Sequence, residues 1–163
     1  MTNKSDKKES GRGEIWVLIQ LVFLAAIALS PLLLSNVLVW SESLKLPGLI
    51  VGVILGISGL LLILWSATNL GSSLTIFPRP KADGTLTQHG VYGIVRHPMY
   101  GGVLLAVLGW SLLTANTPAL ILSVLLGVFF DRKAQREEIW LMQQYPDYAS
   151  YRQRVRKLIP FLY

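Results

Sequence analysis

The sequence predicts an all-α, polytopic membrane protein with about four transmembrane helices, the last two forming a helical hairpin, and with cytoplasmic amphipathic helices at its C-terminal end. Of its 163 residues, 52% are hydrophobic and only 15% are charged, whereas a soluble domain carries about 25% charged residues. Several runs also reach the roughly 20 uncharged residues that cross a hydrocarbon core. The absence of cysteine excludes disulfides and thiolate metal sites, and with only two histidines we expect no metal site.

The chain divides into three regions by composition. Residues 1–13 are polar and charged, which predicts a disordered cytoplasmic tail. Residues 14–68 contain two uncharged runs, 15–34 and a second from residue 46 onward, which we assign to the first two transmembrane helices. Residues 69–163 form the remaining region, which carries every candidate site residue.

The first run also resembles a signal peptide, because basic residues precede it and Ala26-Ile27-Ala28 looks like a cleavage site. However, the apolar stretch continues beyond that tripeptide, and a signal h-region is only about 7–15 residues long. We therefore favour an uncleaved first helix.

The second run carries glycines at four-residue spacing, at Gly48, Gly52 and Gly56, followed by Gly59. In a membrane, such a stripe of small residues lets another helix approach closely. We favour close helix packing over the alternative, a lipid tail or cofactor lying against the glycines.

Residues 99–130 contain no Lys, Arg, Asp or Glu but are interrupted at 114–118 by a Thr-Ala-Asn-Thr-Pro turn sequence. This predicts a hairpin of helices 99–114 and 118–130, both short for a full span. All of the 15 basic residues except Lys45 then lie on one side. The positive-inside rule places both termini and the loop 71–96 in the cytoplasm. If the protein is bacterial, we expect it in the cell inner membrane.

The loop 71–96 is longer than the roughly 2–8 residues that connect helices in bundles, and its mixture of Pro, Gly and large apolar residues predicts an ordered loop on the membrane surface. It ends at Arg96-His97-Pro98. Pro98 suits the first position of a helix, with His97 as its cap. The free N–H groups, the helix dipole and the Arg96 guanidinium favour an anion there. The alternative is an arginine that snorkels to the interface beside a capped helix.

Charged residues begin again at Asp131, where the amphipathic pattern continues. Glu137 and Glu138 are adjacent, so they point about 100° apart on a helix and cannot both face one pocket. Lys133 and Glu137 have the spacing of a simple surface pair, but a carboxylate near the bilayer edge would also suit a cationic ligand. The basic C-terminal run is typical of attraction to anionic membrane lipids, and we expect no nucleic-acid partner.

A ligand with a carboxylate and cationic groups would satisfy these features together. S-adenosylmethionine is such a ligand, with an α-carboxylate, an α-amine and a sulfonium. The rings of Tyr145, Tyr148 and Tyr151 could contact the sulfonium through cation–π attraction.

At these residues the sequence resembles the integral-membrane methyltransferases typified by isoprenylcysteine carboxyl methyltransferase, together with the related phospholipid N-methyltransferases. The similarity extends over about residues 70–160, through the segments 90–92 and 96–102, the Glu137-Glu138 pair, Tyr148 and Tyr151. It departs from the family at Tyr145-Pro146, where Phe-Gly is frequent, and at Gly93, where an Arg commonly follows the Tyr.

The resemblance implies that residues 69–163 are a methyltransferase-like core without a Rossmann domain. This core would hold S-adenosylmethionine, with S-adenosylhomocysteine as product, between the central loop and the C-terminal helices. The expected cofactor-binding residues are Thr85, Leu86, Tyr92, Arg96, His97, Pro98, Met99, Tyr100 and Glu137. Among them Glu137 would take the amine, and Thr85 and Leu86 the adenosyl side. A basic residue one turn before Glu137, either Arg132 or Lys133, would face the acceptor as the catalytic cation.

The function expected from these features is methyl transfer to a lipophilic, membrane-embedded carboxylate or amine at the cytoplasmic face. The acceptor's identity and the oligomeric state stay open. One alternative is an NADPH-dependent reductase of the sterol reductase type, which shares Arg-His-Pro-x-Tyr but usually has Asn at the position of Met99 and an acidic residue in place of Gly101-Gly102. Another is a non-enzymatic transporter or assembly protein, which would need polar groups inside the membrane. The first two helices offer only Gln20, Ser30 and Ser58.

Overall fold

The computed structural model describes residues 13–160 and Tyr163. It consists of the helices α1 (Glu14–Leu33), α2 (Glu42–Leu70), α3 (Pro98–Leu113), α4 (Thr117–Gln144) and α5 (Tyr148–Arg154), with the short 3-10 turns η1 (Gly71–Ser73) and η2 (Gly90–Gly93). The all-α prediction is confirmed for this part of the chain. The disordered tail predicted for residues 1–13 lies outside the described residues, apart from Gly13.

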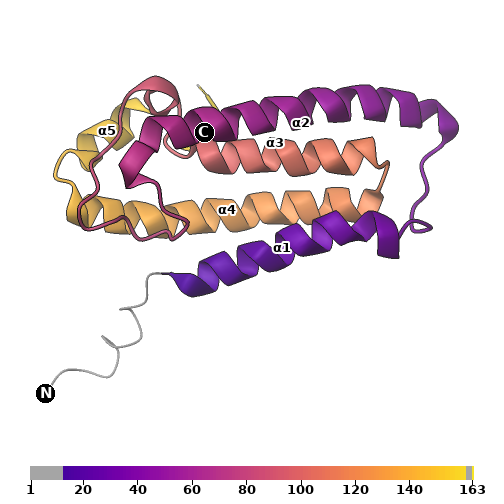
Figure 1. Ribbon diagram of the computed structural model, residues 1–163, viewed down its shortest axis with the longest axis horizontal. Coiled ribbons are helices and arrows are strands. Elements are labelled where there is room, and N and C mark those ends of the chain that lie inside the picture. The colour runs from indigo at the N-terminus through magenta and orange to yellow at the C-terminus, as the bar shows by residue number, and fades with distance from the viewer. Residues whose placement is uncertain (1–12, 161–162) are drawn as a thin grey trace, which may run out of the picture.

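The four long helices lie side by side, with α3 between α2 and α4 and with α1 along α4 (Figure 1). The end of α2, the start of α3, the end of α4, α5 and the connecting loop 71–97 gather at the same end of the molecule (Figure 1). A small apolar core of Ile27, Val107, Leu126 and Phe130 lies between α1, α3 and α4. The helices therefore bring the loop and the C-terminal segment together at one end.

Within the part of the chain that the structure describes, two helices, α1 and α2, are long and apolar enough to cross a membrane, and α3 is a shorter apolar helix. Most of the leucine, isoleucine and valine side chains of α1 and α2 are exposed on the surface. Their exposure suits helices surrounded by lipid, because hydrocarbon tails are as apolar as these side chains.

The glycines of α2 allow close contact with α3. A Cβ atom on Gly59 would lie 2.6 Å from the backbone nitrogen of Ala106, and one on Gly52 would lie 2.6 Å from that of Leu113. Gly56 is different, since a Cβ atom there would meet nothing within 4 Å. The prediction of close helix packing is confirmed, and the backbone of α3 rather than a ligand fills the space beside Gly52 and Gly59.

Two helix boundaries differ from the sequence prediction. Helix α2 starts at Glu42 rather than at residue 46. Its first turn precedes the apolar run and contains the exposed Glu42–Lys45 ion pair. Helix α4 does not end near Phe130 but continues as one helix of 28 residues to Gln144. No glycine or proline interrupts residues 128–144, so the change from apolar to charged side chains does not stop the helix. Pro146 follows the end of α4.

Candidate active site

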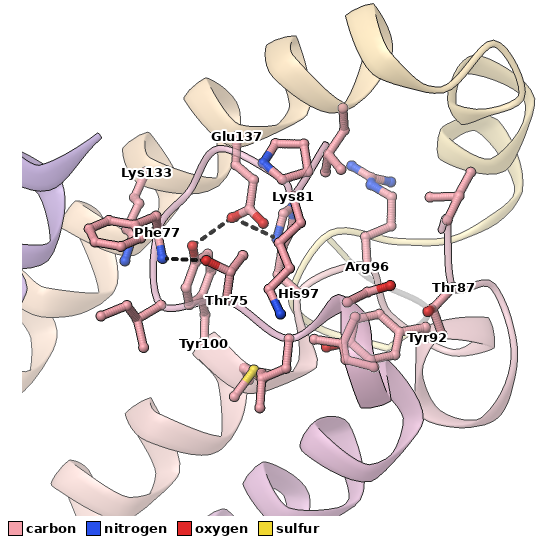
Figure 2. Close-up of a pocket in the computed structure, with 18 of the residues that line it drawn as sticks. Thr75, Phe77, Lys81, Thr87, Tyr92, Arg96, His97, Tyr100, Lys133 and Glu137 are labelled. Atoms are coloured by element: carbon pink, nitrogen blue, oxygen red, sulfur yellow. Dashed lines mark hydrogen bonds and ion pairs between the residues drawn. The ribbon is translucent and has the colours of Figure 1, made fainter. Parts of the chain in front are cut away.

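A cavity of about 410 Å³ opens at the end of the molecule where the loop meets the helices. Its wall combines side chains of α1, α3, α4 and α5 with the loop between α2 and α3. Figure 2 labels members of this wall from the loop, α3 and α4. Nine of the predicted site residues line it: Thr85, Leu86, Tyr92, Arg96, His97, Met99, Tyr100, Lys133 and Glu137.

Pro98 and Arg132 do not line the cavity. Pro98 is buried at the first position of α3 with His97 as the N-cap residue, so it starts the helix as predicted but does not form part of the wall. Arg132 is exposed on α4. Of the two candidate cations, only Lys133 therefore faces the cavity.

Asn69 at the end of α2 fixes the loop next to the cavity. Its Oδ1 accepts a hydrogen bond of 3.0 Å from the backbone N–H of Val91. Gly90 has a φ of +58°, and a Cβ atom there would lie 2.1 Å from Asn69 Oδ1, so both conformation and space require glycine. The next residue but one, Tyr92, is buried in the cavity wall, and its carbonyl accepts a hydrogen bond of 2.6 Å from the Tyr151 hydroxyl.

Arg96 does not leave its guanidinium free for a ligand, which corrects the anion site predicted at this helix start. Its Nη2 lies 2.8 Å from Oε1 of Glu138, and its Nη1 donates to the carbonyl oxygens of Arg152, at 3.1 Å, and of Val155. The anion beside the start of α3 is thus a side chain of the protein itself. The snorkelling alternative is also wrong, because the Arg96 side chain is only 8% exposed.

Glu138 is the important residue that the sequence reasoning did not place. It is 1% exposed, and its Oε1 also lies 3.2 Å from His97 Nε2. Burial opposes its charged form, but hydrogen bonds from His97 and Arg96 and electrostatic interaction with both groups outweigh it and lower its pKa to about 2. The sequence does contain one signal for its burial. Phe130, Ala134 and Glu138 follow one another at four-residue spacing, which places them on one face of a helix, and the first two are also buried.

Glu137 faces the cavity instead, as the 100° offset from Glu138 requires. Its Oε2 accepts a hydrogen bond of 2.6 Å from the Tyr100 hydroxyl and lies 3.8 Å from His97 Nδ1 (Figure 2). The imidazole of His97 therefore lies between a buried carboxylate and one that a ligand can reach.

Lys133 is buried, at 2% exposure, so it is not half of a surface pair with Glu137. Its Nζ donates a hydrogen bond to Oε1 of Gln20 on α1 and lies 5.1 Å from the centre of the Tyr100 ring. This places a cation where the cavity meets the apolar side chains Val17 and Leu21 of α1.

The C-terminal segment after α5 is hydrogen-bonded to the two residues that precede α3. The backbone N–H groups of Arg96 and His97 donate to the carbonyl oxygens of Arg156, at 2.8 Å, and Lys157, at 3.0 Å. The Lys157 ammonium in turn lies 2.5 Å from Asp131 of α4. The residues after α5 thus connect the cavity wall to α4.

Comparison with known proteins identifies relatives of this chain. The phospholipid methyltransferase family matches residues 47–148, more than half of the chain. Protein-S-isoprenylcysteine O-methyltransferase B of Arabidopsis thaliana is 31% identical over 125 residues, which cover 76% of this chain and 61% of the relative. The Schizosaccharomyces pombe protein-S-isoprenylcysteine O-methyltransferase is 35% identical over 82 residues, covering 49% of this chain and 35% of the relative.

The fold also matches a solved structure, that of the eukaryotic intramembrane Ras methyltransferase isoprenylcysteine carboxyl methyltransferase. The TM-score is 0.65 at 23% identity, and the match covers 99% of this chain and 55% of the other. The chain spans less than two thirds of the length of these relatives. Together, the fold and the site define an integral membrane protein with a cavity at one end of its helices, whose largely apolar wall also carries a few polar and charged side chains. The chain belongs to the phospholipid methyltransferase family, which confirms the resemblance to membrane methyltransferases.

Proposed function

We propose that the protein transfers a methyl group from S-adenosylmethionine to a lipophilic, membrane-embedded acceptor and releases S-adenosylhomocysteine. The observation that carries this proposal is the Glu137 carboxylate in a cavity lined by tyrosines at the polar end of membrane helices. Isoprenylated proteins and phospholipids are the acceptor classes that the names of the family and of its relatives suggest.

The residues of the cavity fit this cofactor. Its volume of about 410 Å³ lies within the roughly 300–1,000 Å³ of small-molecule sites. The Glu137 carboxylate suits the α-amine, and the faces of tyrosine rings such as Tyr92 suit a sulfonium. Thr85 and Leu86 would contact the adenosyl side from the loop.

When bound, the cofactor supplies a methyl group on a positively charged sulfur for in-line displacement. The protein's task is then to position the reactants and to exclude water. Tyr100 holds Glu137 Oε2 through its hydroxyl, at 2.6 Å, and so fixes the carboxylate that would bind the amine. Apolar side chains in the wall, such as Leu86 and Leu141, exclude water. A carboxylate acceptor needs no general base.

The acceptor would enter laterally from the bilayer beside α1. Gln20, Val17 and Leu21 of this helix line the cavity next to Lys133. An acidic acceptor would place its carboxylate against the Lys133 ammonium, whereas an amine acceptor would have to arrive neutral. Lys133, rather than Arg132, is therefore our candidate for the residue that orients the acceptor.

We also propose four membrane spans with both termini in the cytoplasm. Helix α4 has 28 residues, which at 1.5 Å per residue gives about 42 Å, enough to cross a bilayer with its last turns outside. The start of α1, the loop and the C-terminal segment lie at one end of the molecule, which supports one cytoplasmic face for all of them (Figure 1).

Radiolabelled methyl transfer tests this function. Purified protein is incubated with methyl-labelled S-adenosylmethionine and vesicles that contain a prenylated cysteine peptide or phosphatidylethanolamine. We expect label in the lipid phase with at least one acceptor. Consumption of NADPH in a parallel incubation to which it is added, without any methyl transfer, would instead support the reductase alternative.

A further inference from the structure

Two tyrosines one turn apart on α5 differ in a way that methyl transfer does not by itself explain. Tyr148 and Tyr151 are 1% and 2% exposed, their rings meet edge to face at 5.6 Å, and both line the cavity. The Tyr151 hydroxyl donates to the Tyr92 carbonyl at 2.6 Å. The Tyr148 hydroxyl is buried and has no hydrogen-bond partner among the described residues.

A buried hydroxyl without a partner is costly, and such groups are rare in folded proteins. The cost would be removed if a bound molecule supplied the missing partner. We propose that Tyr148 is a further ligand-binding residue, whose hydroxyl donates a hydrogen bond to a carboxylate oxygen of the cofactor's amino-acid moiety. This inference rests on the proposed function, because it takes S-adenosylmethionine as the ligand.

The carboxylate is the favoured partner for two structural reasons. First, Arg96, the cation expected to bind the ligand's carboxylate, instead forms an ion pair with Glu138 and donates to backbone carbonyl oxygens. The ligand's carboxylate therefore needs another hydrogen-bond donor. Second, the α-amine and α-carboxylate share one carbon atom, so a ligand whose amine binds Glu137 places its carboxylate close by. Glu137 and Tyr148 line the same cavity.

The surroundings of Tyr148 also keep it a hydrogen donor. Burial raises its pKa, the charges of Glu138 and Glu137 and the nearby Tyr151 raise it further, and Arg96 lowers it by less. The pKa therefore lies far above its ordinary value. The phenol is neutral at physiological pH and can donate its proton to an anionic oxygen.

The test compares Tyr148→Phe with Tyr151→Phe in the full-length protein in detergent. S-adenosylhomocysteine and 5′-methylthioadenosine, which lacks the amino-acid moiety, are titrated by calorimetry, and thermal unfolding is recorded without ligand. We expect Tyr148→Phe to weaken S-adenosylhomocysteine binding by roughly 10-fold or more, to leave 5′-methylthioadenosine binding unchanged, and to keep the wild-type Tm. Tyr151→Phe should lower the Tm, because it leaves the Tyr92 carbonyl without its partner.

Three results would overturn the inference. The first is that Tyr148→Phe binds S-adenosylhomocysteine with wild-type affinity, and the second is that it binds S-adenosylhomocysteine and 5′-methylthioadenosine equally more weakly. The third is a fall in the Tm of Tyr148→Phe as large as that of Tyr151→Phe, which would mean that the Tyr148 hydroxyl has a partner within the protein. Failure of the wild-type protein to bind S-adenosylhomocysteine would instead overturn the proposed function itself.

Discussion

Arg96 and Glu138 form a buried ion pair in which Nη2 and Oε1 are 2.8 Å apart. The same guanidinium donates to the carbonyl oxygens of Arg152, in α5, and Val155, immediately after it. One side chain therefore connects the start of α3 to the last turns of α4 and to α5. The adjacent Glu137 points about 100° away on the same helix and faces the cavity.

Replacement of Glu138 by alanine should destabilise the protein strongly. It would leave Arg96 buried without a compensating charge, and removing one partner of a buried pair costs about 3–5 kcal/mol. Chemical unfolding in detergent measures the loss. Glu42→Ala is the matched control, because the Glu42–Lys45 pair is exposed and should contribute nothing measurable. Equal stability of the two variants would contradict this role of Glu138.

Stability should also fall on acidification. The folded-state pKa of Glu138 is lowered from 4.5 to about 2, so its contribution is complete above the unfolded value and is lost as the pH falls from about 4.5 towards 2. Asp131 acts in the same direction: burial opposes its charge, but hydrogen bonds from Lys157 and Tyr163 outweigh it and lower its pKa. Thermal unfolding measured across this range should show a smaller pH dependence for Glu138→Gln than for the wild type. An unchanged slope would argue against the ion pair.

The contact between α2 and α3 can be tested with two glycines of the same helix. Gly59→Ala should destabilise the protein by separating the helices, because the new Cβ would lie 2.6 Å from backbone atoms of α3. Gly56→Ala meets nothing within 4 Å and should be neutral or stabilising by up to about 1 kcal/mol, since alanine is the better helix former. A Gly56 variant less stable than the Gly59 variant would be inconsistent with this packing.

Lys133→Met should reduce methylation of an acidic acceptor by roughly 10-fold or more, because it removes a charged hydrogen-bond donor and keeps an unbranched side chain. Arg132→Ala should retain activity, since Arg132 is exposed outside the cavity wall. Initial rates with a prenylated cysteine peptide distinguish the two variants. A greater loss in Arg132→Ala would reverse the assignment.

The helices were largely predictable from sequence because their ends have local causes. Helix α1 spans Glu14–Leu33 and α3 spans Pro98–Leu113, each within one residue of the predicted range. The charged Glu14 marks the start of the first, while a proline and a turn sequence mark the two ends of the second. The predicted range 118–130 is shorter than helix α4, which ends at Gln144. The change from apolar to charged residues near residue 131 marks a membrane boundary and not a helix end.

The site was less predictable because its main contact is tertiary. Arg96 and Glu138 are 42 residues apart, and no local rule pairs them, so the sequence predicts an Arg96 guanidinium that is free for a ligand. The choice between Arg132 and Lys133 depends on how α4 is rotated about its axis. A shift of one residue along the helix would turn Arg132 instead of Lys133 towards the cavity. The different directions of Glu137 and Glu138, about 100° apart, by contrast follow from helix geometry alone.

The most direct test of the proposed cofactor site is calorimetric titration of S-adenosylmethionine into the wild-type protein and into Glu137→Ala, with NADPH in parallel. We expect the wild type to bind S-adenosylmethionine and not NADPH, and Glu137→Ala to lose binding while it keeps its fold, because Glu137 is partly exposed in the cavity rather than in the buried ion pair. Wild-type affinity in the Glu137→Ala protein, or binding of NADPH alone, would contradict the account.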